Sequence, residues 1–199
     1  MPTNSNSSES RGYFAKRQHL IYYAYVKMIV RGIAADARSM IDVGSADTSC
    51  LEDFEWVEHR DALDIRRPYS SSSVRGITSD FLKFQPERRY DLALCLQVLE
   101  HIPNARAFAQ KLFDVASAVL ISVPFEWPEG ATTSHIHDPV DMEKLQSWSG
   151  RAPSYSTIVA EPLTRGGKGR RLIAYYHPLG EAFSLSTARH RLRGELSSQ

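Results

Sequence analysis

The sequence predicts an α/β fold, a three-layer sandwich built on a mostly parallel sheet of seven strands with the last strand antiparallel. Short apolar runs alternate with helical patterns along most of the chain, as in sheets whose crossovers are helices. The run Tyr90–Leu96 is almost continuously apolar, which is typical of a strand buried on both faces. Two strand patterns follow each other at 155–161 and 171–176, which indicates a terminal antiparallel pair joined by a glycine-rich turn at 165–169.

The other elements follow from the period of the apolar residues. This period predicts strands at 39–43, 58–65, 74–78, 90–96 and 118–123, and helices at 13–37, 104–117 and 140–149. The first helix is expected to cover an edge of the core with the apolar face Ile21, Ala24, Tyr25, Met28 and Ile29. The connection at 66–73 is short for a parallel crossover, so its helix is expected to be vestigial.

Length and charge restrict the class of protein. The 199 residues fit one domain, which we expect at 13–180, between a disordered segment 1–12 and a loose tail 181–199. The 24 basic and 23 acidic residues nearly balance, so no nucleic-acid partner is expected. The longest apolar run, 20–30, contains Lys27 and is too short to span a membrane. With no secretory signal and two widely spaced cysteines, the chain is expected to be cytoplasmic.

The turn after the first strand is the first candidate for a binding site. Met40, Ile41 and Val43 form the apolar strand, which Gly44 ends. A glycine turn at this place aims backbone N–H groups at open space, where they suit an anionic or strongly hydrogen-bonding cofactor. Because Gly44 stands without further glycines, an ordinary turn is an equally open alternative.

Carboxylates follow three more of the expected strands. Asp64 lies about 20 positions beyond the glycine turn, where a carboxylate commonly holds a ribose diol, and Asp61 is its nearby competitor. Asp80 and Glu100 come after the third and fourth strands. Because ligands bind at the carboxyl ends of parallel strands, these side chains and Gly44 are expected at one edge of the sheet.

Four segments give the chain its resemblance to the class I S-adenosylmethionine-dependent methyltransferases. They are Ile41-Asp42-Val43-Gly44, Ala62-Leu63-Asp64-Ile65, Ser79-Asp80-Phe81, and the strand from Tyr90 leading to Val98-Leu99-Glu100-His101-Ile102. The resemblance implies S-adenosylmethionine as cofactor. The chain departs from the family pattern at Ala46 and Thr48, where further glycines are usual.

The resemblance also implies a role for each matching residue. The turn beside the methionine part of the cofactor would be Asp42, Gly44, Ser45 and Ala46. Asp64, followed by Ile65, would bind the ribose hydroxyls, and Asp80 with Phe81 would bind the adenine. The sulfonium side would be lined by the residues from Gln97 to Glu100.

Three histidines are candidates for a general base that takes a proton from the acceptor. His101 follows Glu100, and a structural role is its alternative. His135 and His137 lie in the long loop 125–139, and in an extended segment both would lie on one side. Asp138 would orient one of these imidazoles, or the loop would be merely solvated or cap a helix. A metal site at His-x-His-Asp is less favoured, because no further ligand is evident in the sequence.

The acceptor is expected to be a small molecule, with an oxygen of a sugar, glycan precursor or secondary metabolite as the methylated atom. Methyltransferases that act on planar amides or base amines carry an Asn/Asp-Pro-Pro-aromatic turn, whereas this chain has Gln97-Val98-Leu99-Glu100 in that place. Phe125, Trp127 and Trp148 are candidates for a wall of the acceptor pocket. Two alternatives stay open, namely a catalytically inactive cofactor-binding or scaffold protein that forms a dimer with an active partner, and a dinucleotide-binding dehydrogenase. A homodimer stays open as the oligomeric state.

Overall fold

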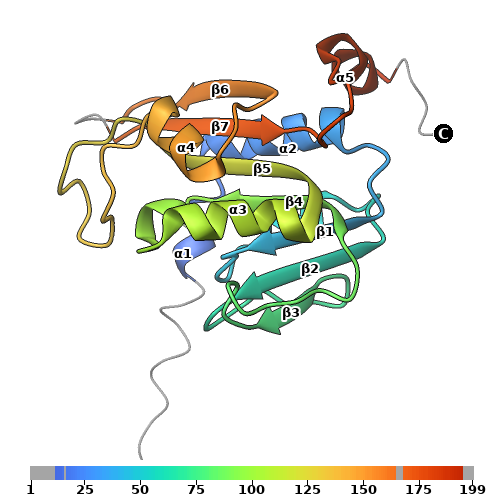
Figure 1. Ribbon diagram of the computed structural model, residues 1–199, viewed down its shortest axis with the longest axis horizontal. Coiled ribbons are helices and arrows are strands. Elements are labelled where there is room, and N and C mark those ends of the chain that lie inside the picture. Colours follow the sequence, from blue (N-terminus) through green and yellow to red (C-terminus); the bar gives the residue numbers. More distant parts are fainter. Residues whose placement is uncertain (1–11, 16, 165–167, 195–199) are drawn as a thin grey trace, which may run out of the picture.

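The computed structural model describes residues 12–15, 17–164 and 168–194, with a seven-stranded sheet at the centre (Figure 1). Except for Gly12, the expected disordered segment 1–12 lies outside these residues, as do positions 165–167 of the expected turn. The helices are α1 (Gly12–Ala15), α2 (Ile21–Ile33), α3 (Ala105–Val115), α4 (Met142–Ser149) and α5 (Leu185–Leu192), with short 3₁₀ helices η1 (Cys50–Asp53) and η2 (Leu99–His101). The strands are β1 (Ser39–Val43), β2 (His59–Asp64), β3 (Arg75–Thr78), β4 (Tyr90–Leu96), β5 (Ala116–Pro124), β6 (Tyr155–Ala160) and β7 (Arg170–Tyr176).

The sheet has the strand order β3-β2-β1-β4-β5-β7-β6 and confirms the expected fold class. Strands β1 to β5 pair in parallel, while β7 runs antiparallel to both of its neighbours, β5 and β6. The order reverses between β1 and β4: the chain leaves β1 toward β2 and leaves β4 toward β5, so a crevice opens beyond the carboxyl ends of these two strands. The reversed β7 brings its amino end to this same edge.

Two apolar layers hold the helices on the sheet. One layer lies under α3 and α4 and includes Ile41, Ala93 and Ile121. The other lies under α2 and includes Met40, Leu92 and Ile173. Neighbouring strand residues alternate between the two layers, because successive side chains of a strand point to opposite faces. Figure 1 shows the resulting sandwich, with α3 and α4 on one face of the sheet and α2 on the other.

The amino-terminal helix differs from the expectation in length and in orientation. The predicted helix 13–37 is divided into α1 and α2, because Leu20 has extended backbone angles immediately before α2. Of the predicted buried face, Ile29 is buried as expected, whereas the prediction is wrong for Ile21, Tyr25 and Met28, which are exposed. The core side of α2 consists of Tyr22, Val26, Ile29 and Val30, with Gly32. Tyrosine can fill a core position as well as isoleucine, so apolar periodicity alone does not choose between adjacent faces.

Other element boundaries agree with the sequence to within a few residues. The predicted helix 104–117 ends two residues earlier, because Ala116 already pairs with Tyr90 as the first residue of β5. The connection 66–73 has no helix, as expected.

The tail beyond 181 contains α5, which packs on α2 so closely that a Cβ on Gly32 would lie 3.2 Å from the carbonyl oxygen of Ala188. Among the described helices, none has the length and apolar character that crossing a membrane requires.

The amino terminus of α2 is capped from a distant part of the chain. Leu20, the residue before the helix, makes no side-chain capping bond. Instead, the carboxylate of Glu161 accepts hydrogen bonds from the backbone N–H groups of Ile21 and Tyr22, both at 2.9 Å. Glu161 is 7% exposed and also lies 3.5 Å from Arg171. A negative charge at this end of a helix accepts hydrogen bonds from the free N–H donors and interacts favourably with the positive end of the helix dipole. Glu161 therefore fixes where α2 begins.

We expect Glu161→Ala to lower the free energy of unfolding by about 2–4 kcal/mol, because it removes two charge-assisted bonds and leaves buried donors unsatisfied. Urea unfolding followed by circular dichroism measures the change. Glu87→Ala, at an exposed loop position, is the control and should leave the midpoint unchanged. Equal midpoints for both variants would show that α2 does not depend on this cap.

Candidate functional site

One cavity of about 570 Å³ lies at the carboxyl edge of the parallel strands. Its walls come from the turn after β1, the ends of β2 and β4, the segment after β3, the long loop after β5 and the start of α2. Most of the predicted site residues line it, namely Gly44, Ser45, Ala46, Asp64, Ile65, Asp80, Phe81, Gln97, Glu100, His101 and His135. Residues far apart in the sequence therefore meet where ligands of such sheets bind.

The turn after β1 requires glycine for two reasons. Gly44 has φ +80°, a conformation that favours glycine, and a Cβ there would lie 2.6 Å from Cγ2 of Val98. Its N–H donates to the carbonyl oxygen of Leu63 at 2.7 Å. Ala46 also has positive φ, at +45°, and its N–H donates to Oδ2 of Asp64 at 3.2 Å. The turn and the end of β2 thus form one connected cradle.

The two aspartates expected to bind the cofactor are both held in place by backbone groups. Oδ1 of Asp64 accepts hydrogen bonds from the N–H groups of Arg66, at 2.8 Å, and Arg67, at 3.0 Å. Oδ1 of Asp80 accepts one from Leu82 at 3.0 Å. These bonds fix the position of each carboxylate at the cavity wall. Asp61, the competitor of Asp64, instead binds Arg75 and Tyr90. Its Oδ2 lies 2.6 Å from the guanidinium and 2.5 Å from the phenol oxygen.

Asp42 does not line the cavity but lies buried beside the turn, at 2% exposure. Burial, with the negative charge of Asp64 as a second cause, raises the pKa of Asp42 to about 7. Its expected role in shaping the turn stays a prediction, and its side chain does not line the cavity.

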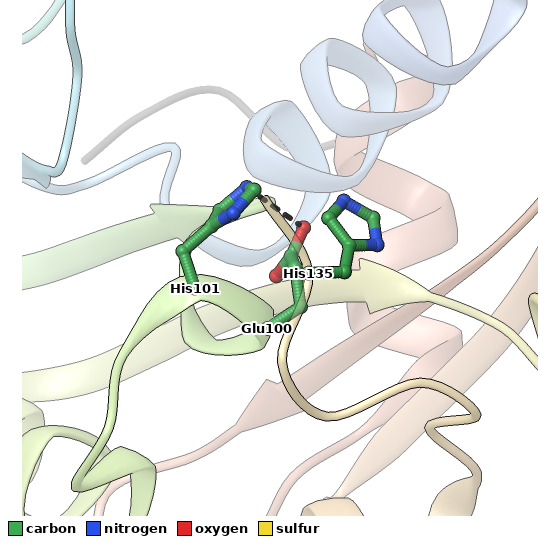
Figure 2. A group of neighbouring side chains, drawn as sticks. All are labelled: Glu100, His101 and His135. Atoms are coloured by element: carbon green, nitrogen blue, oxygen red, sulfur yellow. Dashed lines mark ion pairs between the residues drawn. The ribbon is translucent and has the colours of Figure 1, made fainter. Parts of the chain in front are cut away.

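Glu100, His101 and His135 form a cluster at one wall of the cavity (Figure 2). Glu100 and His101 are neighbours in η2, and His135 reaches them from the long loop. Nε2 of His101 lies 3.9 Å from Oε1 of Glu100, and the two imidazole rings are 4.8 Å apart, edge to face. The indole of Trp127 stacks on His135 at 5.5 Å.

Burial sets the charge of this cluster. Glu100 is 1% exposed, and burial raises its pKa to about 8. Burial also lowers the pKa of His101, so its imidazole is neutral at neutral pH. The Glu100 carboxyl group, kept from ionising beside the neutral imidazole of His101, makes no ion pair with a permanently charged side chain of the residues that the structure describes. A cationic ligand in the cavity would provide a positive partner.

No protein-family model and no curated protein matches the sequence, whereas solved structures do match at low identity. The N-methyltransferase NodS from Bradyrhizobium japonicum WM9, solved with S-adenosylhomocysteine, has a TM-score of 0.61 at 10% identity, covering 79% of this chain and 87% of its own. The 1,6-didemethyltoxoflavin-N1-methyltransferase from Burkholderia thailandensis, solved with its substrate and S-adenosylhomocysteine, has a TM-score of 0.60 at 16% identity, covering 89% and 93%.

This chain has the class I methyltransferase fold. The resemblance inferred from the four sequence segments is thereby confirmed at the level of the fold. A third match shows how far that conclusion extends, since the [4+2]-cyclase SpnF has a TM-score of 0.60 at 10% identity and covers 79% of this chain and 81% of its own. Because one fold can host different reactions, the function has to be argued from the site.

Besides Asp42, three predicted residues lie outside the cavity of this methyltransferase fold. His137 is not at the cavity, because its Nε2 lies 2.8 Å from the carbonyl oxygen of Ile102 and its ring packs on Trp148. The expectation that His135 and His137 share one side is therefore wrong. Trp148 is buried in α4, and Phe125 lies under Arg170, so of the three expected wall aromatics only Trp127 lines the cavity.

Arg171 lines the cavity although the sequence reasoning did not select it. Its guanidinium lies over the rings of Tyr22 and Trp127, at 5.5 and 5.6 Å, and so joins α2 to the long loop. A signal was present: β7 is antiparallel, so a residue at its amino end lies at the carboxyl edge of the other strands. Arg171 pairs with Pro124 at the end of β5, as this direction requires.

We expect Gly44→Ala to destabilise the protein by about 2–4 kcal/mol, since it adds both backbone strain and a collision with Val98. Gly130→Ala is the matched control, because Gly130 has φ +71° with no atom within 4 Å of the added Cβ and so pays only the strain. Urea unfolding compares them, and equal losses would contradict the close packing of the turn. The double variant Gly44→Ala/Val98→Ala removes the collision with the Val98 methyl groups, so of the two effects only the backbone strain at position 44 remains.

The raised pKa of Asp42 predicts how stability changes with pH. Between its ordinary value of 3.8 and about 7, the folded protein retains a proton that the unfolded chain has lost. The free energy of unfolding should therefore fall as pH rises through this range, with a contribution from Asp42 on the order of 3–4 kcal/mol. Asp42→Asn should lose that contribution to the slope, whereas the exposed control Asp114→Asn should keep it. Denaturant unfolding at several pH values measures both slopes.

Proposed function

We propose that this protein transfers a methyl group from S-adenosylmethionine to an oxygen of a small-molecule acceptor. The observation that carries the proposal is the single cavity that joins the Gly44 turn and the carboxylates of Asp64 and Asp80 to the Glu100, His101 and His135 cluster. Its volume of about 570 Å³ lies within the usual range for small-molecule sites, about 300–1,000 Å³.

The residues present fit S-adenosylmethionine. The turn at Gly44 lacks the side chain that would fill the space before Val98, and its backbone lies open to the cavity. Asp64 and Asp80, on adjacent strand ends, are acceptors for ribose hydroxyls and for an adenine amino group. Glu100 offers a buried carboxyl group whose ionised form a nearby sulfonium would favour.

The holding residues are then those of the cradle. Gly44, Ser45 and Ala46 would contact the methionine part of the cofactor, Asp64 and Ile65 the ribose, and Asp80 and Phe81 the adenine. Gln97 and Glu100 would lie on the sulfonium side. When bound, S-adenosylmethionine supplies a methyl group that its sulfonium sulfur already activates. The protein therefore needs to align the acceptor, exclude water and accept a proton.

His101 and His135 are the residues able to accept that proton. Both line the cavity, and the neutral imidazole of His101 has the protonation state of a base. Trp127, stacked on His135 and covered by Arg171, gives the acceptor an aromatic wall. An imidazole base suits a hydroxyl acceptor, which must lose its proton during transfer. This favours oxygen in a sugar, glycan precursor or other secondary metabolite over nitrogen.

We expect S-adenosylhomocysteine to bind one-to-one in isothermal titration calorimetry, and Asp64→Ala to weaken this binding about 10- to 100-fold, because charge-assisted bonds to the ribose are lost. Asp114→Ala, on the exposed side of α3, is the control and should bind as the unchanged protein does. No detectable binding at high protein concentration would contradict the proposal. Binding of NAD in its place would favour a dehydrogenase.

The alternative is a cofactor-binding partner without catalysis. It is favoured by the four-residue 3₁₀ helix η1 in place of a full helix after the glycine turn, and by Thr48 at the cavity wall. Mass spectrometry of a metabolite pool incubated with the protein and S-adenosylmethionine separates the two. A product heavier by one methyl group supports the enzyme, whereas cofactor binding without any product supports the partner.

A further inference from the structure

The loop that carries His135 is tied to η2 on both sides of this residue. Nδ1 of His101 lies 2.8 Å from the carbonyl oxygen of Ser134, and the N–H of Ile136 donates to the carbonyl oxygen of Glu100 at 3.0 Å. The positions before and after His135 are thus both bonded to the Glu100–His101 pair. Two segments more than 30 positions apart are held together at the point where three side chains converge (Figure 2).

The hydrogen bonds of both histidines leave the same nitrogen free. A carbonyl oxygen can only accept, so Nδ1 of His101 carries the proton and Nε2 of the neutral ring has the lone pair. Nδ1 of His135 lies 2.7 Å from Oδ2 of Asp138, and as the donor to this carboxylate it too leaves Nε2 free. Histidines that bind a metal are characteristically oriented in this way, with the second ring nitrogen donating to a carbonyl or carboxylate.

Glu100 supplies the third ligand and is an independent observation. Its side chain is 1% exposed, and neither carboxylate oxygen accepts a hydrogen bond from another residue in the described part of the chain. Such a carboxylate is costly unless a positive group pairs with it. Arg171, which lines the same cavity, lowers the pKa of Glu100 by less than burial raises it, because its ion pair at 3.5 Å is with Glu161.

We propose that Glu100, His101 and His135 bind a divalent first-row transition-metal cation such as Zn²⁺ at the wall of the cavity. Two imidazole nitrogens and one carboxylate oxygen are a ligand set suited to Zn²⁺, Fe²⁺ or Co²⁺, whereas Mg²⁺ and Ca²⁺ prefer oxygen alone. One ligand atom from each residue lies within 4.8 Å of the others. Ligands about 2.1 Å from a metal are at most about 4.2 Å apart, so the three side chains need to draw together by only about half an ångström to hold the cation.

This site deepens the proposed function and rests on it for its role. The three ligands line the cavity, so a cation among them would face the acceptor and leave coordination positions open to it. A bound acceptor hydroxyl would then lose its proton to water more readily, because a cation lowers the pKa of an oxygen that it binds. His101 and His135 would serve as ligands in that state and not as bases.

We expect the chelator-treated full chain to bind one Zn²⁺ in isothermal titration calorimetry. Glu100→Gln, His101→Gln and His135→Gln should each weaken binding about 100-fold or more, since each removes a ligand. Asp138→Asn should weaken it about 10-fold, because it loosens the orientation of His135. The controls His59→Gln, at an exposed surface position, and His137→Gln, in the same loop, should bind as the unchanged protein does.

Thermal unfolding without metal shows whether each variant is folded. If the variants at buried positions do not fold, His101→Gln, at a partly exposed position, tests the metal site. The proposed site would be overturned if the unchanged protein showed no saturable binding of Zn²⁺, or if His101→Gln bound Zn²⁺ as tightly as the unchanged protein. The visible absorption of Co²⁺ gives a second measurement, since coordination by the two imidazoles changes its spectrum. Titration with S-adenosylhomocysteine is carried out in parallel. Binding of metal without S-adenosylhomocysteine would contradict the proposed function and support the metal site. Binding of S-adenosylhomocysteine without metal would contradict the metal site and support the proposed function.

Discussion

The common direction of strands β1 to β5 is the constraint on which the site depends. Hydrogen-bonded in parallel, these strands bring their carboxyl ends to one edge, so side chains that each follow a different strand become neighbours. β7 runs the other way and contributes the residue at its amino end, Arg171. The cavity is thus a consequence of strand direction and order, whereas its chemistry depends on which few side chains follow the strands.

Buried carboxyl groups and strained backbone are found together at this edge of the sheet. Asp42 and Glu100 are almost completely buried, and burial raises the pKa of both carboxyl groups. Positive φ at Ala46 and Gln97, which both carry a side chain, adds backbone strain in the segments after β1 and β4. Strain and unpaired polar groups lower stability and persist where the surrounding sheet can support them. Their concentration around one cavity is typical of a binding or catalytic site.

The sequence predicted the strands, their direction and most of the cavity lining, because these follow from local patterns. Continuous apolar runs identify parallel strands, and a residue just beyond such a run lies at the edge that the strands share. The orientation of α2 was wrong, since Tyr22 could replace Ile21 at the core. The place of His137 was also wrong, because the course of the long loop depends on bonds to η2 that leave no trace in the sequence. Glu161 as the cap of α2 is a contact of the same kind.

The histidine cluster shows why the tautomer matters as much as the distance. Had Nε2 of His101 bonded to Ser134, its lone pair would point away from Glu100 and the ring could serve neither as base nor as ligand at the cavity. With Nδ1 occupied, both roles stay available to the same nitrogen. They differ in what they ask of Glu100: a base beside a neutral carboxyl group needs no counter-charge, whereas a cation needs the carboxylate ionised and bound. Glu100 accepts no hydrogen bond from any other residue among those described, so a cation bound in the proposed site would stabilise the ionised form of its carboxyl group.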